Sequence, residues 1–119
     1  MSGKSLKEVQ KEVHEFIDQF EEGYWHLYGM LAALVEEIGE LAREINHLKG
    51  IKPKKDTELT EIKTELGDIL FSLACIANDL DIDLEEAFNM TMKKYWERDK
   101  NRWTKKRNRG DKSKEESYD

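Results

Sequence analysis

The sequence predicts an all-α fold, a four-helix, bundle-like domain followed by a charged tail. Three observations support this fold class. Charged residues make up 39% of the chain and hydrophobic residues 38%, a mixture typical of amphipathic helices. Only one proline occurs among the 119 residues. Apolar residues recur at steps of three and four over four long segments, which is the period of one helix face.

The first predicted helix runs from about Ser5 to Phe20. Ser5 followed by Glu8 matches a capping box at its N-terminus. A short linker then carries three aromatic residues and a histidine between Gly23 and Gly29. Glycine supplies the backbone angles that a turn needs. Two interpretations of this linker remain open: it caps the end of the core, or it forms a stacking wall for a base.

The second predicted helix spans about Tyr28 to Leu48, and the third spans Thr57 to about Leu80. Each carries a continuous apolar stripe. Between them lies a polar turn that begins near Gly50, a residue type common at helix C-termini, and contains Pro53. Because helices joined by a short turn pack against each other in opposite directions, we expect an antiparallel pair.

The fourth predicted helix starts after Asp83, which with Glu86 matches a second capping box, and continues towards Trp103. From residue 105 to residue 119 the chain is densely charged and almost free of apolar residues, which is typical of a flexible tail. We therefore expect one helical domain over residues 1–104 and a flexible polar tail over residues 105–119.

One stretch of the second predicted helix recurs in the third. Residues 34–41 read Leu-Val-Glu-Glu-Ile-Gly-Glu-Leu, and residues 64–70 read Thr-Glu-Leu-Gly-Asp-Ile-Leu. Both contain an acid, an aliphatic residue, a glycine and a second acid in the same order. The matched acids are Glu37 and Glu40 in the first copy and Glu65 and Asp68 in the second.

These four acids are expected to converge. Acids three residues apart share one helix face. Glu37 and Asp68 are equally distant in sequence from the turn at Pro53. The same holds for Glu40 and Glu65. Antiparallel packing therefore places the two residues of each pair at the same height along the helix axes. All-oxygen ligation favours Mg²⁺ or Mn²⁺ over zinc, and Mg²⁺ usually completes its coordination with water and substrate phosphates. The sequence therefore indicates a metal site that acts on a phosphate substrate.

Two features distinguish this pattern from ordinary surface acids. One acidic pair at this spacing would indicate little, because such pairs often only face solvent. Here the pattern is repeated, and each copy has a mid-helix glycine, Gly39 or Gly67, which costs about 1 kcal/mol relative to alanine. A cost repeated at matched positions indicates the close approach of another helix or of a ligand.

The motif Glu36-Glu37-x-x-Glu40 followed by Glu65-x-x-Asp68 resembles the signature of the MazG-type all-α nucleoside triphosphate pyrophosphohydrolases, in particular their small single-domain members. The resemblance implies hydrolysis of a (deoxy)nucleoside triphosphate to its monophosphate and pyrophosphate, by attack of water on the α-phosphorus. It also implies that the four matched acids, Glu37, Glu40, Glu65 and Asp68, hold Mg²⁺.

The resemblance extends from the aromatic linker through Lys94-Tyr95-x-x-Arg98 and suggests further roles. Glu36 is expected to orient water, and Glu36 or Glu40 to accept its proton. Lys94 and Arg98 share one helix face and could contact phosphates, or could be ordinary surface charges. The remaining candidates are Trp25 with Tyr24 or His26 for base stacking, and Asn78 for contact with a sugar or base.

The resemblance also implies a homodimer or homotetramer with its pocket near the subunit interface, and a housekeeping role in the nucleotide pool. The net charge of -6 argues against binding of a nucleic-acid polymer. No apolar run is long enough to span a membrane. The lone Cys75 has apolar neighbours, so we expect a buried structural thiol in a reducing cytoplasm.

Two other functions remain open. A non-catalytic helical interaction module would contain similar helices but would not depend on divalent metal. A di-iron carboxylate bundle would need Glu-x-x-His on two helices. Glu44 and His47 supply one such step, but the third predicted helix contains no histidine.

Overall fold

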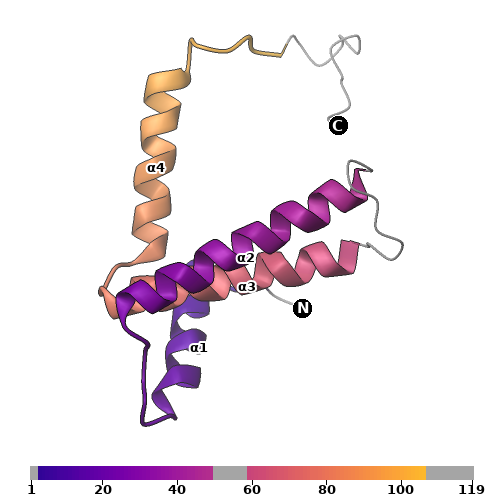
Figure 1. Ribbon diagram of the computed structural model, residues 1–119. Helices are drawn as coiled ribbons and strands as arrows, with labels where there is room; N and C mark the ends of the chain where they lie inside the picture. The colour runs from indigo at the N-terminus through magenta and orange to yellow at the C-terminus, as the bar shows by residue number, and fades with distance from the viewer. Residues whose placement is uncertain (1–2, 50–58, 107–119) are drawn as a thin grey trace. The chain divides into compact units, whose positions relative to one another are not determined.

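The computed structural model describes residues 3–49 and 59–106. Over these residues the chain forms no strand and four α-helices, which are α1 (Leu6–Asp18), α2 (Leu27–Leu48), α3 (Leu59–Asp79) and α4 (Leu84–Asp99) (Figure 1). The all-α prediction is therefore confirmed. None of the described helices combines the length and apolar character that crossing a membrane requires. The turn at Gly50 and Pro53 and most of the predicted tail lie outside the described residues.

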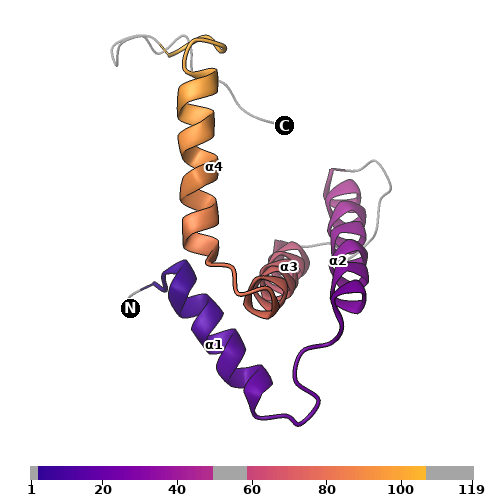
Figure 2. The ribbon, with the colours of Figure 1, turned by 90° about the vertical axis from the view of Figure 1, so that its left-hand side faces the viewer.

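The chain divides into two compact units, Met1–Ala87 and Phe88–Asp119. In the first unit, α2 and α3 lie side by side and run in opposite directions, as two views of the ribbon show (Figures 1 and 2). α3 also packs against α1. In the second unit, α4 ends at Asp99 rather than continuing towards Trp103. The antiparallel pair is thus present, while the domain boundary after residue 104 stays a prediction.

The N-terminus of α1 carries the predicted capping box. The Oγ of Ser5 accepts a hydrogen bond from the backbone N–H of Glu8 at 3.1 Å, and Oε1 of Glu8 accepts one from the backbone N–H of Ser5 at 2.8 Å. α1 ends at Asp18, earlier than predicted. Its last turns still pack on α3, because the rings of Phe16 and Phe71 meet edge to face at a centroid distance of 6.1 Å.

The turn between α3 and α4 contains a residue in the left-handed region. Asp81 has a φ of 56°, and its N–H donates to the Asn78 carbonyl at 3.1 Å. The N–H of Ile82 donates to the Ala77 carbonyl at 2.8 Å. These two bonds form a Schellman motif, whose left-handed position is usually a glycine. Asp83 then caps α4, because its Oδ1 accepts from two backbone N–H groups of the first turn at 2.9 and 3.3 Å.

The core of the first unit is small. Its buried members are Val13, Met30, Ala74 and Cys75. Cys75 is therefore a buried thiol, as predicted, and burial raises its pKa. In the described part of the chain no large side chain is fully buried, and many large apolar side chains of α2 and α3 are exposed. These two helices thus keep apolar surface that the described residues of the first unit do not cover.

Candidate functional site

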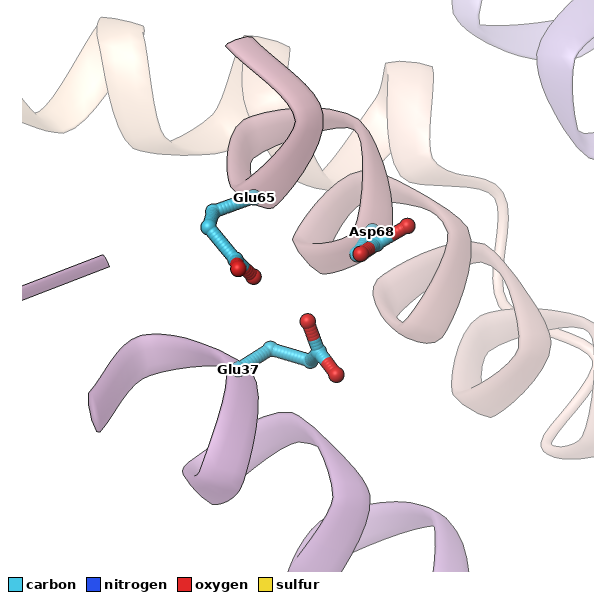
Figure 3. A group of neighbouring side chains, drawn as sticks. All are labelled: Glu37, Glu65 and Asp68. Carbon is cyan, nitrogen blue, oxygen red and sulfur yellow. The ribbon is translucent and has the colours of Figure 1, made fainter. Parts of the chain in front are cut away.

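Three of the four predicted acids meet between α2 and α3. Glu37 on α2 and Glu65 and Asp68 on α3 each place one carboxylate oxygen within 4.8 Å of the others. Figure 3 shows the three side chains directed towards one another from the two helices. Glu65 and Asp68 lie about one turn apart on α3, and the antiparallel pairing sets Glu37 opposite them. The sequence repeat therefore brings these three carboxylates into one group.

Because the three carboxylates lie close together, simultaneous ionisation of all three is unfavourable. Hydrogen bonding with Glu65 raises the pKa of Glu37 from 4.5 to about 7, and partial desolvation and the nearby charge of Asp68 add to the increase. A hydrogen bond between two carboxyl groups requires a proton on one of them. Without a cation, the group therefore retains a proton near neutral pH.

The donor set of this group fits a hard divalent cation. All of its ligand atoms are carboxylate oxygens, which Mg²⁺ and Mn²⁺ prefer. The Oε1 atom of Glu65 is buried, and no hydrogen-bond donor in the described residues reaches it. Burial of such an oxygen is costly unless a partner compensates it. A cation bound to Glu37, Glu65 and Asp68 would supply that partner.

Glu40 is not part of this group in the structure. Its Oε1 lies 3.4 Å from Nη2 of Arg43 on the same helix, and both side chains are exposed. An exposed ion pair of this kind contributes at most about 1 kcal/mol, so Arg43 holds Glu40 only weakly. Glu36 is exposed on α2 beside Glu37. The roles expected of Glu36 and Glu40 stay predictions.

The two glycines of the repeat have open space beside them. A Cβ atom added to Gly39 or Gly67 would meet no atom within 4 Å in the part of the chain that the structure describes. The close approach expected there is therefore not made by α1, α2 or α3 of this chain. Another helix or a ligand stays the expected neighbour.

A cavity of about 430 Å³ has lining residues one helical turn from the carboxylate group, although none of the three carboxylates lines it. Ala33, in its lining, lies one turn before Glu37 on α2. Ser72, also in its lining, lies one turn after Asp68 on α3. The cavity and the carboxylates therefore occupy the same faces of the same two helices. The other lining residues are Ile17, Phe20, Glu22, Gly23, Tyr24, Trp25, Met30, Phe71 and Cys75.

The aromatic linker forms one wall of this cavity. Trp25 and Tyr24 both line it, as stacking against a base would require. The side chain of Trp25 is 67% exposed and thus accessible to a ligand. Tyr24 is fixed instead: its hydroxyl forms a hydrogen bond with Nδ1 of His14 at 2.9 Å and accepts one from Nδ2 of Asn78 at 3.1 Å.

His26 has a structural role at the N-terminus of α2. It is the N-cap residue, and its Nδ1 accepts a hydrogen bond from the backbone N–H of Gly29 at 3.0 Å. A Cβ atom on Gly29 would lie only 3.1 Å from Cε1 of His26, so the glycine makes room for this cap. Gly23 has a φ of 64°, which explains the other glycine of the linker. Base stacking by His26 stays a prediction.

Asn78 belongs to an internal hydrogen-bond network. Its Nδ2 donates to the carbonyl of Gln10 at 3.0 Å as well as to Tyr24, and its Oδ1 accepts from Nε2 of Gln10 at 2.9 Å. Gln10 also donates to the carbonyl of Ile82 and accepts from the N–H of Leu84, each at 2.8 Å. The structure thus uses Asn78 to fix Tyr24 to α1 and α3, and its contact with a sugar or base stays a prediction.

Lys94 and Arg98 lie on α4 in the second unit. Both cations face the ring of Tyr95, with Nζ of Lys94 5.3 Å and Cζ of Arg98 5.0 Å from its centroid. Arg98 also pairs with Asp99, whose Oδ1 lies 2.9 Å from its Nε. Both cations thus have local partners, and their contact with phosphates stays a prediction.

Several cavity residues were not among the predicted site residues, notably Met30, Phe71 and Ser72. Apolar residues at helical spacing do not distinguish a packed core from the wall of a cavity. A usable signal was nevertheless present for Ser72. It lies one turn beyond Asp68, so extending the acidic face of the third helix by one turn leads to it.

The Glu-x-x-His step at Glu44 and His47 is separate from the carboxylate group. Glu44 is buried, and its Oε1 lies 4.0 Å from Nδ1 of His47. Neither residue is among the side chains that converge as possible metal ligands in the described chain. α3 offers no histidine to complete a di-iron site, so the structure adds no support for that function.

Comparison with known proteins identifies several similar sequences and structures. Residues 26–103 match the family model of the MazG nucleotide pyrophosphohydrolase domain. The uncharacterized protein YpjD of Bacillus subtilis (strain 168) is 54% identical over 107 residues, which cover 89% of this chain and 96% of that protein. The crystal structure of the Bacillus-conserved MazG protein, a nucleotide pyrophosphohydrolase, is 49% identical with a TM-score of 0.72, over 86% of this chain and 100% of that one. A crystal structure of YpjD from Bacillus subtilis is 53% identical with a TM-score of 0.74, over 80% and 98% of the two chains.

Proposed function

This chain belongs to the MazG nucleotide pyrophosphohydrolase family, and from that premise we propose that it hydrolyses (deoxy)nucleoside triphosphates to the nucleoside monophosphate and pyrophosphate. One observation carries most of this proposal: the carboxylate group and the aromatic cavity are neighbours on α2 and α3. Carboxylates suit a cation that binds phosphates, and the cavity suits the flat apolar ring of a base. The carboxylate group would therefore receive the phosphates of a nucleotide, and the cavity would receive its base.

Glu37, Glu65 and Asp68 would hold Mg²⁺, or Mn²⁺ in its place. Glu40 would join them by turning away from Arg43, which loses only an exposed ion pair. Such an ion, when bound, lowers the pKa of water and offsets the negative charge of the phosphates. Glu37, whose pKa is raised to about 7 by its hydrogen bond with Glu65, would release its proton on binding the ion, since only ionised carboxylates bind metal well.

Hydrolysis would proceed by attack of water on the α-phosphorus. The water oxygen forms a bond to this phosphorus while the bond to the oxygen that bridges to the β-phosphorus breaks, so pyrophosphate leaves with the electron pair. Glu36 would accept the proton that the water loses, or Glu40 would accept it instead of binding the cation, because neither belongs to the three converged carboxylates. The products are the nucleoside monophosphate and pyrophosphate.

Substrate binding would use residues outside the carboxylate group. Trp25 would stack on the base, since its exposed side chain lines the cavity. Tyr24 would support the same wall, because two hydrogen bonds fix its hydroxyl. The family resemblance assigns contacts with phosphate oxygens to Lys94 and Arg98, and these contacts are part of the proposal.

We also propose that the protein is a homodimer or homotetramer. Leu31, Val35 and Ile38 follow one another along α2 as exposed apolar residues, and Val35 is 60% exposed. Leu66 and Leu70 are exposed on α3, Leu66 to 53%. Full burial of such a side chain contributes about 1.5–3 kcal/mol. A second copy would cover this surface, and the pocket would lie near the interface because the same two helices carry the carboxylates.

The proposed setting is the cytoplasm, where the enzyme would act as a housekeeping hydrolase of the nucleotide pool. Cys75 is the only cysteine and a free thiol, which suits a reducing compartment. The net charge of -6 does not suit binding of a nucleic-acid polymer, so free nucleotides are the proposed substrates.

Incubation with each nucleoside triphosphate and MgCl₂ tests the proposed reaction. We expect pyrophosphate and the monophosphate as products, and no orthophosphate. Glu65→Gln and Asp68→Asn should each lower kcat by about a hundredfold or more, the scale expected when a group that stabilises transition-state charge is lost. Both variants should keep a helical circular dichroism spectrum. Glu15→Gln, which changes an exposed acid on α1, is the matched control and should keep full activity.

The alternative outcomes distinguish other functions. Orthophosphate as the product would contradict attack on the α-phosphorus. Full activity of either site variant would contradict the assignment of the carboxylates. If no triphosphate is hydrolysed and Mg²⁺ leaves the melting temperature unchanged, the chain is better explained as a non-catalytic helical interaction module.

A further inference from the structure

The cavity beside the carboxylates has one charged residue in its lining. Glu22 follows α1 and lines the cavity, and every other lining residue is uncharged. An ionised carboxylate accepts hydrogen bonds and donates none. A ligand that reaches Glu22 is therefore favoured when the edge it presents carries N–H groups.

The hydroxyl and thiol groups of the lining discriminate poorly between ligands. The Tyr24 hydroxyl already has partners in Asn78 and His14. The Ser72 hydroxyl can donate or accept, so it accommodates either kind of ligand group, and the thiol of Cys75 forms only weak hydrogen bonds. No hydrogen bond or ion pair within the described residues occupies the carboxylate of Glu22. Glu22 is thus the one charged acceptor of the lining, whereas the indole N–H of Trp25 only donates.

The position of Glu22 in the chain suits contact with the base end of a nucleotide. Glu22 and the linker precede α2, which begins at Leu27, and Glu37 lies further along this helix. At 1.5 Å per residue, the rise from Leu27 to Glu37 is roughly 15 Å. A nucleotide with its phosphates at the carboxylates would extend its base towards the linker. The negative charge of Glu22 would also disfavour the reversed orientation, because it repels phosphates.

We propose that Glu22 makes the enzyme prefer nucleotides whose base carries an exocyclic amino group. Guanine fits best, because N1–H and the 2-amino group are adjacent donors that match the two oxygens of a carboxylate. Cytosine and adenine offer one amino group each. Uracil and thymine place two carbonyl oxygens beside their only donor, and hypoxanthine lacks the 2-amino group of guanine. This inference rests on the proposed function, since it assumes that a nucleotide base occupies the cavity.

The test compares kcat/KM for nucleotides that differ in the hydrogen-bond donors of the base. GTP and ITP differ only in the 2-amino group. CTP and UTP differ at position 4 and at N3, which accepts a hydrogen bond in cytosine and donates one in uracil. We expect the wild-type protein to favour GTP over ITP and CTP over UTP by about tenfold in kcat/KM. This ratio corresponds to the lower end of the free-energy range for a hydrogen bond to a charged group. Glu22→Gln should lower both ratios to about threefold or less. Glu21→Gln changes the neighbouring acid, which is outside the cavity lining, and should leave both ratios unchanged.

Each ratio is measured on one protein sample, so the fraction of folded protein cancels. Ratios near one in the wild-type protein overturn the inference, and so do high ratios that persist in Glu22→Gln. If no triphosphate is hydrolysed, the proposed function fails and a binding measurement decides the inference. GMP and IMP are then titrated against the fluorescence of Trp25 in the double variant Trp96→Phe, Trp103→Phe. GMP should bind about tenfold more tightly, whereas equal or absent binding overturns the inference.

Discussion

Metal binding by the carboxylate group should depend steeply on pH below neutrality. The pKa of Glu37 is about 7, because this carboxyl group is hydrogen bonded to Glu65 and lies near Asp68. A cation must displace its proton. With this pKa, the ionised fraction of Glu37 falls from about 0.9 at pH 8 to about 0.01 at pH 5. The apparent Kd for Mn²⁺ should therefore increase about a hundredfold over this range, or about tenfold per pH unit below 7.

Mn²⁺ suits this measurement because the electron paramagnetic resonance signal of the free ion is lost on binding. Titrations at several pH values between 5 and 8 give the apparent Kd at each. Glu37→Gln removes the titrating group, so the variant should bind Mn²⁺ more weakly at pH 8 and should show no break near pH 7. Glu15→Gln should reproduce the wild-type curve.

The same pKa predicts an opposite trend for the stability of the metal-free protein. The folded-state pKa of Glu37 is raised above 4.5, so the folded protein favours the protonated carboxyl group. The contribution of this group to stability is complete below pH 4.5 and is lost as the pH rises through 7. At pH 8, Glu37→Gln should therefore raise the melting temperature of the metal-free protein and remove the stabilisation by Mn²⁺. A Kd for Mn²⁺ that is constant from pH 5 to pH 8 would contradict the raised pKa of Glu37. So would a Glu37→Gln variant that is less stable than the wild-type protein at pH 8 without metal.

Three further substitutions test other parts of the structure. Asp81→Gly should increase the free energy of unfolding by about 0.5–1 kcal/mol, because glycine adopts the positive φ of this turn without strain; an unchanged or lower melting temperature would contradict this. Asn78→Ala should decrease the free energy of unfolding in urea by about 2–3 kcal/mol, since it leaves polar groups of Gln10 and Tyr24 without partners; a loss below about 0.5 kcal/mol would show that the network contributes little. Val35→Glu should convert the proposed homo-oligomer to monomers in sedimentation velocity, and an unchanged sedimentation coefficient would exclude this face of α2 from the proposed interface.

Short-range patterns predicted the helices and most of the carboxylate group. The capping box at Ser5 is a local signal, because all of its atoms come from adjacent residues of one segment. The meeting of Glu37 with Asp68 follows from the antiparallel pairing of two long helices. The position of Glu40 could not be predicted from the helix face alone. Arg43 lies three residues further along the same helix and is close enough to pair with Glu40.

The cavity and its supporting network could not be predicted from the same patterns. Phe20 follows α1 and Phe71 lies on α3, far apart in the sequence, and only tertiary packing shows that they line one space. The hydrogen bonds between Gln10 and Asn78 likewise join distant segments. Helical periodicity assigns such residues to a face, but it does not tell which side chain on another helix that face will meet.

The cavity combines residues from two regions of the chain that carry different tasks. α1 and the segment after it contribute Ile17, Phe20 and Glu22 to the wall, whereas all the acids of the repeat lie on α2 and α3. The proposed selection of the base by Glu22 would therefore be encoded outside the two helices that carry the acids of the repeat. Substitutions in the first helix can change which nucleotide fits without altering the carboxylates. Under the proposed function, changes in this one short segment would alter the choice of nucleotide without changing the acids of the repeat.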